Sequence, residues 1–174
     1  SDIFMEQADL YQTLGQFNEA VNTYRVVLNE APSPVRGEEA LQRLTTALQL
    51  AGNIPESENH CVQFLQKYPT SPLVPAVMFR ASENAFAQAE VVFKTPAAAN
   101  RDAEMIRLYG EAEKRYAALL AKAPEYPQIS LAKYGQALCN YRLGKYDIAA
   151  KQLAAIPAAD RAEQLAPVGF LVAD

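Results

Sequence analysis

One spacing recurs along the chain and constrains its fold more than any other feature. A glycine is followed two positions later by a bulky residue, three positions after that by a small residue, and four further on by a larger apolar residue or cysteine. Three segments carry it in full: Gly15, Phe17, Ala20, Tyr24; Gly52, Ile54, Ser57, Cys61; and Gly144, Tyr146, Ala149, Leu153. A fourth lacks the glycine but keeps Tyr109, Ala112 and Tyr116, and prolines close the four segments at Pro32, Pro69, Pro124 and Pro157.

This spacing predicts a repeated helix hairpin. Glycine ends the first helix because it adopts the left-handed backbone conformation at little steric cost. The small residue lets two helices approach closely, and apolar residues three to four positions apart lie on one helical face. Proline ends the second helix because it has no amide hydrogen and crowds the preceding turn. No period-two alternation indicates a strand, so the sequence predicts an all-α fold.

Helix boundaries follow from the same punctuation. We expect helices at 2–15, 18–31, 35–51, 55–68, 72–93, 101–122, 128–143, 146–156 and 161–173. Ser33, Ser71 and Thr95 each place a capping hydroxyl before a proline that suits the first helical position. Asp160 and Glu163 have the spacing of a capping box.

These residues resemble the tetratricopeptide repeat family, and the resemblance covers nearly the whole chain. The first repeat matches the signature best, at Tyr11, Gly15, Phe17, Ala20, Tyr24, Leu28 and Pro32. The chain departs from the signature at Phe4, where the family has Trp, at Gln7, where it has Leu, and at Ser57, where Ala is usual. The resemblance implies a right-handed superhelical stack of antiparallel helix hairpins, an α-solenoid of about four repeats plus a terminal helix.

We expect a single domain over residues 1–174, with repeats at 1–34, 35–71, 72–126 and 127–157 and a terminal helix at 158–174. The third repeat carries roughly 20 residues beyond the usual 34, which predicts a long hairpin. That hairpin is either a tolerated insertion or a contact for a partner or a second copy. Because the chain begins at Ser1 and stops in an apolar stretch, we also expect it to be a piece of a longer protein.

Charge and hydropathy exclude several kinds of partner. The net charge is −4 and no run of Lys and Arg occurs, so nucleic acid is not expected, since its binding depends on clustered cations. No apolar stretch reaches the roughly 20 residues that a membrane helix needs, so direct membrane insertion is not expected either. Cys61 and Cys139 lie in different repeats, and we expect buried free thiols rather than a disulfide or a metal site.

The chemistry-bearing residues do not form a catalytic pattern. His60 and Cys61 are adjacent on an expected helix, where neighbouring side chains do not face each other. Paired carboxylates fall at helix starts or on exposed faces, where they favour the helix N-terminus. The glycines are isolated, and no His, Cys or Asp cluster has metal-ligand spacing. We therefore expect no catalytic residue, no cofactor, no metal and no enzymatic activity.

In the family that the chain resembles, the first helix of each hairpin lines a concave groove. Carrying those positions over gives a polar half at Met5, Asp9, Gln12, Gln42, Thr46 and Gln49. The other half is the candidate partner-binding site: Phe79, Glu83, Phe86, Tyr134, Leu138 and Tyr141. Its rings recur at a spacing of seven on one helical face and suit binding anchors. The alternative is that they pack between neighbouring hairpins.

Two functional hypotheses follow. The first is a non-catalytic protein–protein interaction module that binds a partner peptide or helix in the groove. The alternative is a structural segment of a larger envelope or assembly scaffold, which self-associates through the apolar stretch 167–172 or the hairpin at 72–123. The segment from Phe64 to Pro72 resembles repeats of bacterial cell-envelope proteins of the BamD and Tol–Pal-associated type. That resemblance favours the periplasm or cell envelope over the cytoplasm.

Overall fold

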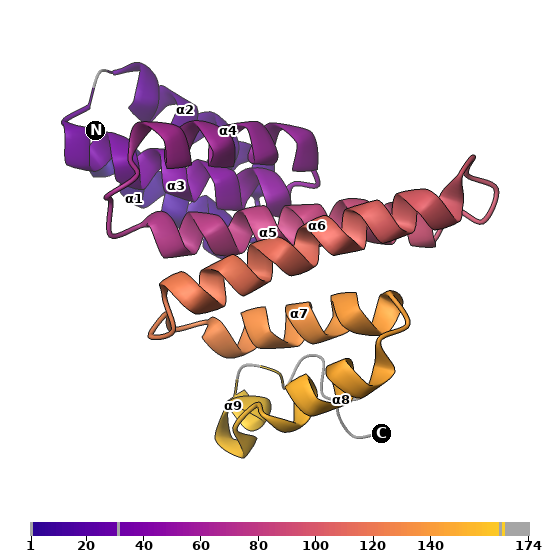
Figure 1. Ribbon diagram of the computed structural model, residues 1–174. Helices are drawn as coiled ribbons and strands as arrows, with labels where there is room; N and C mark the ends of the chain where they lie inside the picture. The colour runs from indigo at the N-terminus through magenta and orange to yellow at the C-terminus, as the bar shows by residue number, and fades with distance from the viewer. Residues whose placement is uncertain (1, 31, 164, 166–174) are drawn as a thin grey trace. The chain divides into compact units, whose positions relative to one another are not determined.

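The computed structural model describes residues 2–30, 32–163 and 165. Helices and the turns between them make up this part of the chain, and it contains no strand (Figure 1). In order, the helices are α1 (Asp2–Thr13), α2 (Phe17–Asn29), α3 (Pro34–Leu50), α4 (Ile54–Lys67), α5 (Val74–Phe93), α6 (Arg101–Lys122), α7 (Ile129–Arg142), α8 (Tyr146–Ala154) and α9 (Ala158–Glu163). The predicted all-α fold is confirmed.

The helices divide into two compact units, Ser1–Asn84 and Ala85–Asp174, with the boundary inside α5. In unit 1, α1 packs against α2, α2 against α3, and α3 against α4. In unit 2, α6 packs against α7, and α7 against α8. Each unit is thus built from helices that pack against their neighbours in sequence. The division of the chain into four repeats and a terminal helix stays a prediction.

The glycine turns have the predicted geometry. Gly15, Gly52 and Gly144 have φ values of 75°, 83° and 78°, in the left-handed region. In the first turn, the amide of Gln16 donates to the carbonyl of Tyr11 over 2.8 Å. Equivalent bonds follow Gly52 and Gly144, at 2.9 Å each. This is the Schellman arrangement, which satisfies carbonyls that the end of a helix leaves without partners.

Side-chain capping follows the prediction at one of the three expected sites. The hydroxyl of Ser33 accepts a bond from the amide of Arg36 over 3.4 Å at the start of α3. Ser71 instead closes a short turn by accepting from the amide of Leu73 over 3.2 Å, and α5 begins at Val74. The Thr95 hydroxyl donates to the carbonyl of Val91, in the last turn of α5, so it caps no helix start.

The predicted capping box at Asp160 is wrong. Asp160 lies inside α9, which begins at Ala158, and its carboxylate accepts a 2.6 Å hydrogen bond from the hydroxyl of Ser130 on α7. The aspartate therefore joins two helices of unit 2 rather than starting one. Of the helix expected at 161–173, residues 161–163 form the end of α9, and the part beyond them, apart from Leu165, lies outside the described residues.

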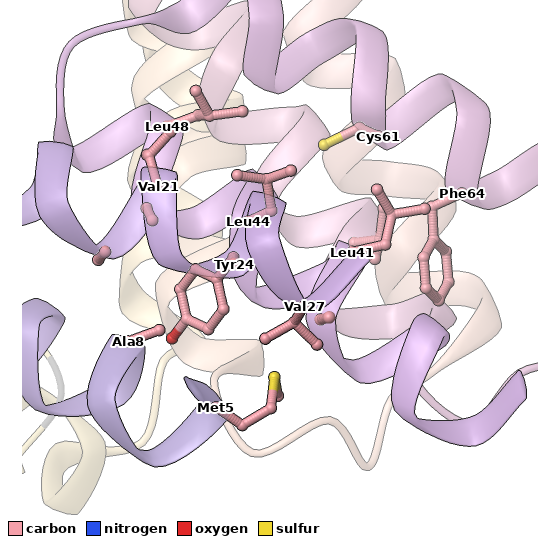
Figure 2. Close-up of a cluster of buried hydrophobic side chains, with 14 of the residues drawn as sticks. Met5, Ala8, Val21, Tyr24, Val27, Leu41, Leu44, Leu48, Cys61 and Phe64 are labelled. Carbon is pink, nitrogen blue, oxygen red and sulfur yellow. The ribbon is translucent and has the colours of Figure 1, made fainter. Parts of the chain in front are cut away.

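The core of unit 1 is formed by all of its helices. Figure 2 shows Met5 from α1, Tyr24 from α2, Leu44 from α3 and Phe64 from α4 directed into one cluster. Each of these four side chains is almost fully buried. Burial of large apolar side chains of this kind is the main favourable term in folding, at about 1.5 to 3 kcal/mol for each side chain.

The small residue of the repeat lies at a tight helix contact in both units. Ala20 and Ser57 in unit 1 and Ala112 and Ala149 in unit 2 are all buried. Unit 2 adds a second close approach, between Gly135 of α7 and the ring of Tyr116 of α6. A Cβ atom built on Gly135 would lie 2.4 Å from Tyr116 Cζ, so only glycine fits there. The four small residues are thus buried, as a position between packed helices requires.

Candidate interaction surfaces

Polar side chains connect the first helices of the hairpins in unit 1. Asp9 of α1 accepts a hydrogen bond from the guanidinium of Arg43 of α3. It also accepts one from the hydroxyl of Tyr24 over 2.6 Å. Burial, with this hydrogen bond second, raises the pKa of Tyr24 above its ordinary value. Asp9, one of the polar positions expected in a groove, thus holds helices of unit 1 together.

A second polar network links α3, α4 and α5. Gln49 donates to the Asn84 amide oxygen over 2.8 Å, and Asn84 donates to the Ser57 hydroxyl over 2.9 Å. The Ser57 hydroxyl in turn donates to the carbonyl of Thr45 over 2.8 Å. Ser57, which replaces the usual alanine, therefore has a structural partner in the buried Asn84. No sequence pattern predicts this network.

Two of the six predicted site residues lie in unit 1, and neither is an open anchor. Phe79 is only 3% exposed. Glu83 is partly exposed and is paired with Arg80, whose Nη1 lies 2.8 Å from a Glu83 carboxylate oxygen. Burial raises the pKa of Glu83, and the positive charge of Arg80 opposes that shift. Phe79 is therefore a packing residue, and Glu83 forms an ion pair with a residue of its own helix.

Phe86 in unit 2 is partly buried against α6. Its ring meets that of Tyr109 edge to face, with the centroids 5.9 Å apart. The Tyr109 hydroxyl donates to Glu90 over 2.5 Å, and Arg142 Nε donates to the same carboxylate oxygen over 3.2 Å. Burial, followed by the bond to Glu90, raises the pKa of Tyr109. This cluster ties α5, α6 and α7 together within unit 2.

Tyr134 is an interior residue, contrary to its expected role in a groove. It is 6% exposed and packs in a cluster with Ile156 and Leu165. Its hydroxyl is buried without a hydrogen-bond partner among the described residues, and burial raises its pKa. Leu138 packs on the same cluster and keeps part of its side chain at the surface.

Tyr141 is the one predicted site residue that is largely exposed. It is 52% exposed, and Tyr146, at the start of α8, is 61% exposed. Their rings meet edge to face with centroids 5.3 Å apart, so the two residues form a surface aromatic pair across the α7–α8 turn. Tyr146 was identified from sequence only as a repeat residue. The sequence feature that could have indicated its exposed position is its place two residues after Gly144, next to the α7–α8 turn.

A groove of about 490 Å³ runs between α5 and α6 in unit 2. Its lining is part apolar and part charged, and consists of Ala85, Gln88, Ile106, Arg107, Leu108, Gly110, Glu111, Lys114 and Arg115. The roughly 20 extra residues of the third repeat predict the long hairpin that contains these residues, but no sequence pattern predicts the groove itself. The other expected self-association segment, 167–172, lies outside the described residues.

The described residues contain no arrangement suited to nucleophilic or metal chemistry. Cys61 and Cys139 are free and buried, as predicted. Burial raises the pKa of each thiol to about 12, which disfavours the reactive thiolate. His60 Nδ1 lies 3.1 Å from Gln63, and Nε2 lies 3.6 Å from Glu56, so the imidazole pairs with neighbours on its own helix. No group of three or more potential metal ligands occurs in the described part of the chain.

None of the helices between residues 2 and 163 combines the length and the apolar character needed to cross a bilayer.

Comparison with known proteins identifies the repeat type at the N-terminus. Residues 2–33 match the family model of the tetratricopeptide repeat. Such repeats are generally non-catalytic protein–protein interaction modules. A search of the curated proteins found no match.

Solved structures similar to this chain include two that cover most of it. One is the crystal structure of nearly identical TPR-like repeats from a Podosopora anserina protein assigned as a kinesin light chain. It is 18% identical, spans 94% of this chain and 96% of that chain, and gives a TM-score of 0.46. The other is the crystal structure of MamA protein, 18% identical over 93% of each chain with a TM-score of 0.47. Because the sequence identities and the TM-scores are low, the all-α fold class is assigned from the helices of this chain and not from these two structures.

Proposed function

We propose that the chain is a non-catalytic protein–protein interaction module that binds a partner peptide or helix on unit 2. The proposed contact residues are Tyr141 and Tyr146, with the partly exposed Leu138 three residues before Tyr141 on α7 and the partly exposed Phe86 on α5. Phe79 and Tyr134 are left out because both are buried. The repeat match at residues 2–33 supports the general role.

The exposed Tyr141–Tyr146 pair is the observation that carries this proposal. Two tyrosines that are more than half exposed offer large apolar area together with hydroxyl groups that can hydrogen-bond. Tyrosine loses little conformational entropy on binding, because few side-chain torsions become fixed. The edge-to-face contact also holds each ring in place before a partner arrives. A preorganised aromatic pair of this kind is suited to anchoring a helix or an extended peptide.

The test compares wild type with a Tyr141→Ala/Tyr146→Ala variant in affinity capture from the source cell, followed by titration with the recovered partner. We expect the double substitution to weaken binding by about 2 kcal/mol or more, the range of interface hot spots. Val62→Ala is the matched control, because Val62 is an exposed apolar residue on α4 in unit 1. Equal binding by wild type and the double variant would contradict the proposed site.

A structural role through self-association is the second candidate function. The observation that favours it is exposed apolar surface at two other places, on α1 and on α6. If that role is the principal one, the double tyrosine variant should behave as wild type in any assembly.

A further inference from the structure

The groove between α5 and α6 carries a local charge opposite to that of the whole chain. The chain has a net charge of −4, yet Arg107, Lys114 and Arg115 line the groove against the single carboxylate of Glu111. Arg107 is paired with Glu104 and Arg115 with Glu111, at 2.8 Å and 3.0 Å. Lys114 forms no ion pair with any residue that the structure describes. It leaves one cation at the groove available to a partner.

Gly110 keeps this surface open. It lies in the middle of α6, where glycine is less favourable than alanine by roughly 1 kcal/mol. No atom lies within 4 Å of a Cβ built on it, so packing inside the protein does not require the glycine. Ile106, Gly110 and Lys114 succeed one another at intervals of four, on one face of α6. Ile106 is 65% exposed, so the row is apolar, then bare, then cationic.

The outer face of α1 has the complementary character. Ile3 and Leu10 are both more than half exposed and are seven residues apart, which places them on one side of the helix, and Leu14, the first residue after α1, is also more than half exposed. The helix contains Asp2, Glu6 and Asp9 but no Lys or Arg. Asp2 is paired with Arg36 and Asp9 with Arg43. Glu6 is exposed beside the apolar residues and has no ion pair among the described residues.

We infer that α1 of one copy of this chain docks on the α5–α6 groove of a second copy. Ile3 and Leu10 would cover Ile106 and the bare surface at Gly110, and Glu6 would meet Lys114. A small residue at the point of contact lets two helices approach closely, and apolar burial supplies the affinity. The opposite charges select the orientation. This contact uses neither Tyr141 nor Tyr146, so it goes beyond the binding role proposed above.

The inferred contact is heterologous, because two different faces meet. Each copy keeps one unused α1 face and one unused groove, so the assembly grows head to tail into rings or open chains. The test is sedimentation velocity of the full chain at low ionic strength, with the protein concentration raised from about 10 μM to about 1 mM. This range covers the dissociation constants of weak to moderate interfaces. We expect the average mass to rise with concentration. A monomer throughout this range would overturn the inference.

Single substitutions locate the two faces. Lys114→Glu and Glu6→Lys should each weaken self-association about tenfold or more, since each places like charges opposite one another. Lys122→Glu is the matched control, with the same charge change in the last turn of the same helix but outside the groove lining. Equal weakening by the control would mean that net charge alone governs association, against the inferred contact.

Gly110→Leu separates binding from stability. The substitution fills open surface and replaces glycine with a good helix former, so we expect an unchanged or higher Tm. The same leucine would block the approach of α1, so self-association should fall about tenfold. Association that persists in a folded Gly110→Leu variant would overturn the inference.

Mixing provides the sharpest test. The Glu6→Lys chain has an intact groove, and the Lys114→Glu chain has an intact α1 face. Each should self-associate about tenfold more weakly than wild type, while an equal mixture should recover association, because both contacts between unlike chains pair opposite charges. A mixture that associates no better than either variant alone would exclude the α1–groove contact. The Tyr141→Ala/Tyr146→Ala variant should self-associate as wild type does, which distinguishes failure of this inference from failure of the proposed function.

Discussion

The α3–α4 turn of unit 1 and the α5–α6 connection of unit 2 both join consecutive helices, but different interactions close them. In the first, backbone bonds at Gly52 and Asn53 close the turn, at 3.0 and 2.9 Å, and the positive φ of Gly52 makes them possible. Every group in that closure lies within a few residues in sequence. The turn is therefore encoded locally.

In unit 2, backbone bonds also close the end of α5, from Lys94 to Glu90 and from Thr95 to Val92, and side chains add to them. Arg101 donates to the Phe93 carbonyl over 2.6 Å, and the Arg142 guanidinium lies 3.9 Å from the centroid of the Phe93 ring. Asn100 takes the left-handed conformation, at φ 51°, where the other turns have glycine. Because Arg142 belongs to α7, this connection depends on a residue far away in sequence. A short repeated turn can be recognised from sequence, whereas such a clamp is seen only in the folded chain.

Helix contact at the small repeat position should be the feature that the two units share most closely. Ala20→Leu in unit 1 and Ala149→Leu in unit 2 should each cost about 3 kcal/mol, the upper end for overpacking, because both alanines are buried at helix contacts. Urea unfolding of each variant measures the loss. A large loss in only one unit would break the parallel, and unchanged stability in both would show that the contacts are misassigned.

Replacing a helical glycine by alanine should affect stability differently in the two units. Gly135→Ala in unit 2 should cost about 1 to 2 kcal/mol, because the new methyl group overlaps the buried Tyr116 ring. Gly37→Ala in unit 1 is the matched control, since its Cβ would lie 3.7 Å from the nearest atom, on Pro32. It should be neutral or stabilise by up to about 1 kcal/mol, because alanine favours the helix. Similar Tm shifts in the two variants would contradict the packing described for unit 2.

The turns themselves can be tested by exchanging their residues. Gly52→Ala should cost about 1 kcal/mol, since a side chain disfavours the left-handed conformation. Asn100→Gly should change stability by less than about 0.5 kcal/mol, because side chains elsewhere close that connection. Thermal unfolding of both variants compares them directly. A larger effect at Asn100 than at Gly52 would reverse the distinction between the two turns.

The smallest effects concern the polar contacts. Ser57→Ala introduces the residue usual in the family, yet it should cost about 1 kcal/mol, because it removes a partner of the buried Asn84. In unit 2, Arg101→Ala should cost about 0.5 kcal/mol through the lost bond to the end of α5. Chemical denaturation resolves both. Stabilisation by Ser57→Ala would show that the Asn84 network contributes nothing net.

Most of the helix pattern could be predicted from the chain alone. The expected bounds of the first eight helices lie within two residues of those observed, because glycine, proline and apolar spacing act over one or two helical turns. Asp160 shows the limit of such reasoning. Its spacing to Glu163 suits a capping box, but the hydroxyl of Ser130, 30 residues earlier, is its partner.

The candidate site was predictable only in part. A spacing of seven correctly places Tyr134 and Tyr141 on one face of α7, but it does not say which neighbour covers that face. In the structure, Tyr134 is buried against Ile156 and Leu165, whereas Tyr141 is exposed and contacts Tyr146. Burial depends on distant helices, so periodicity cannot distinguish an anchor for a partner from a residue of the core.

The sequence by itself determined the helices, the glycine turns and the small residues at helix contacts, because these depend on backbone conformation and on spacing within one or two turns. The tertiary structure alone decided which aromatic rings are buried, how Asn84 and Glu90 find their partners, and where the α5–α6 groove lies. Each of these brings together residues from different helices, and helix packing sets their distances rather than spacing along the chain.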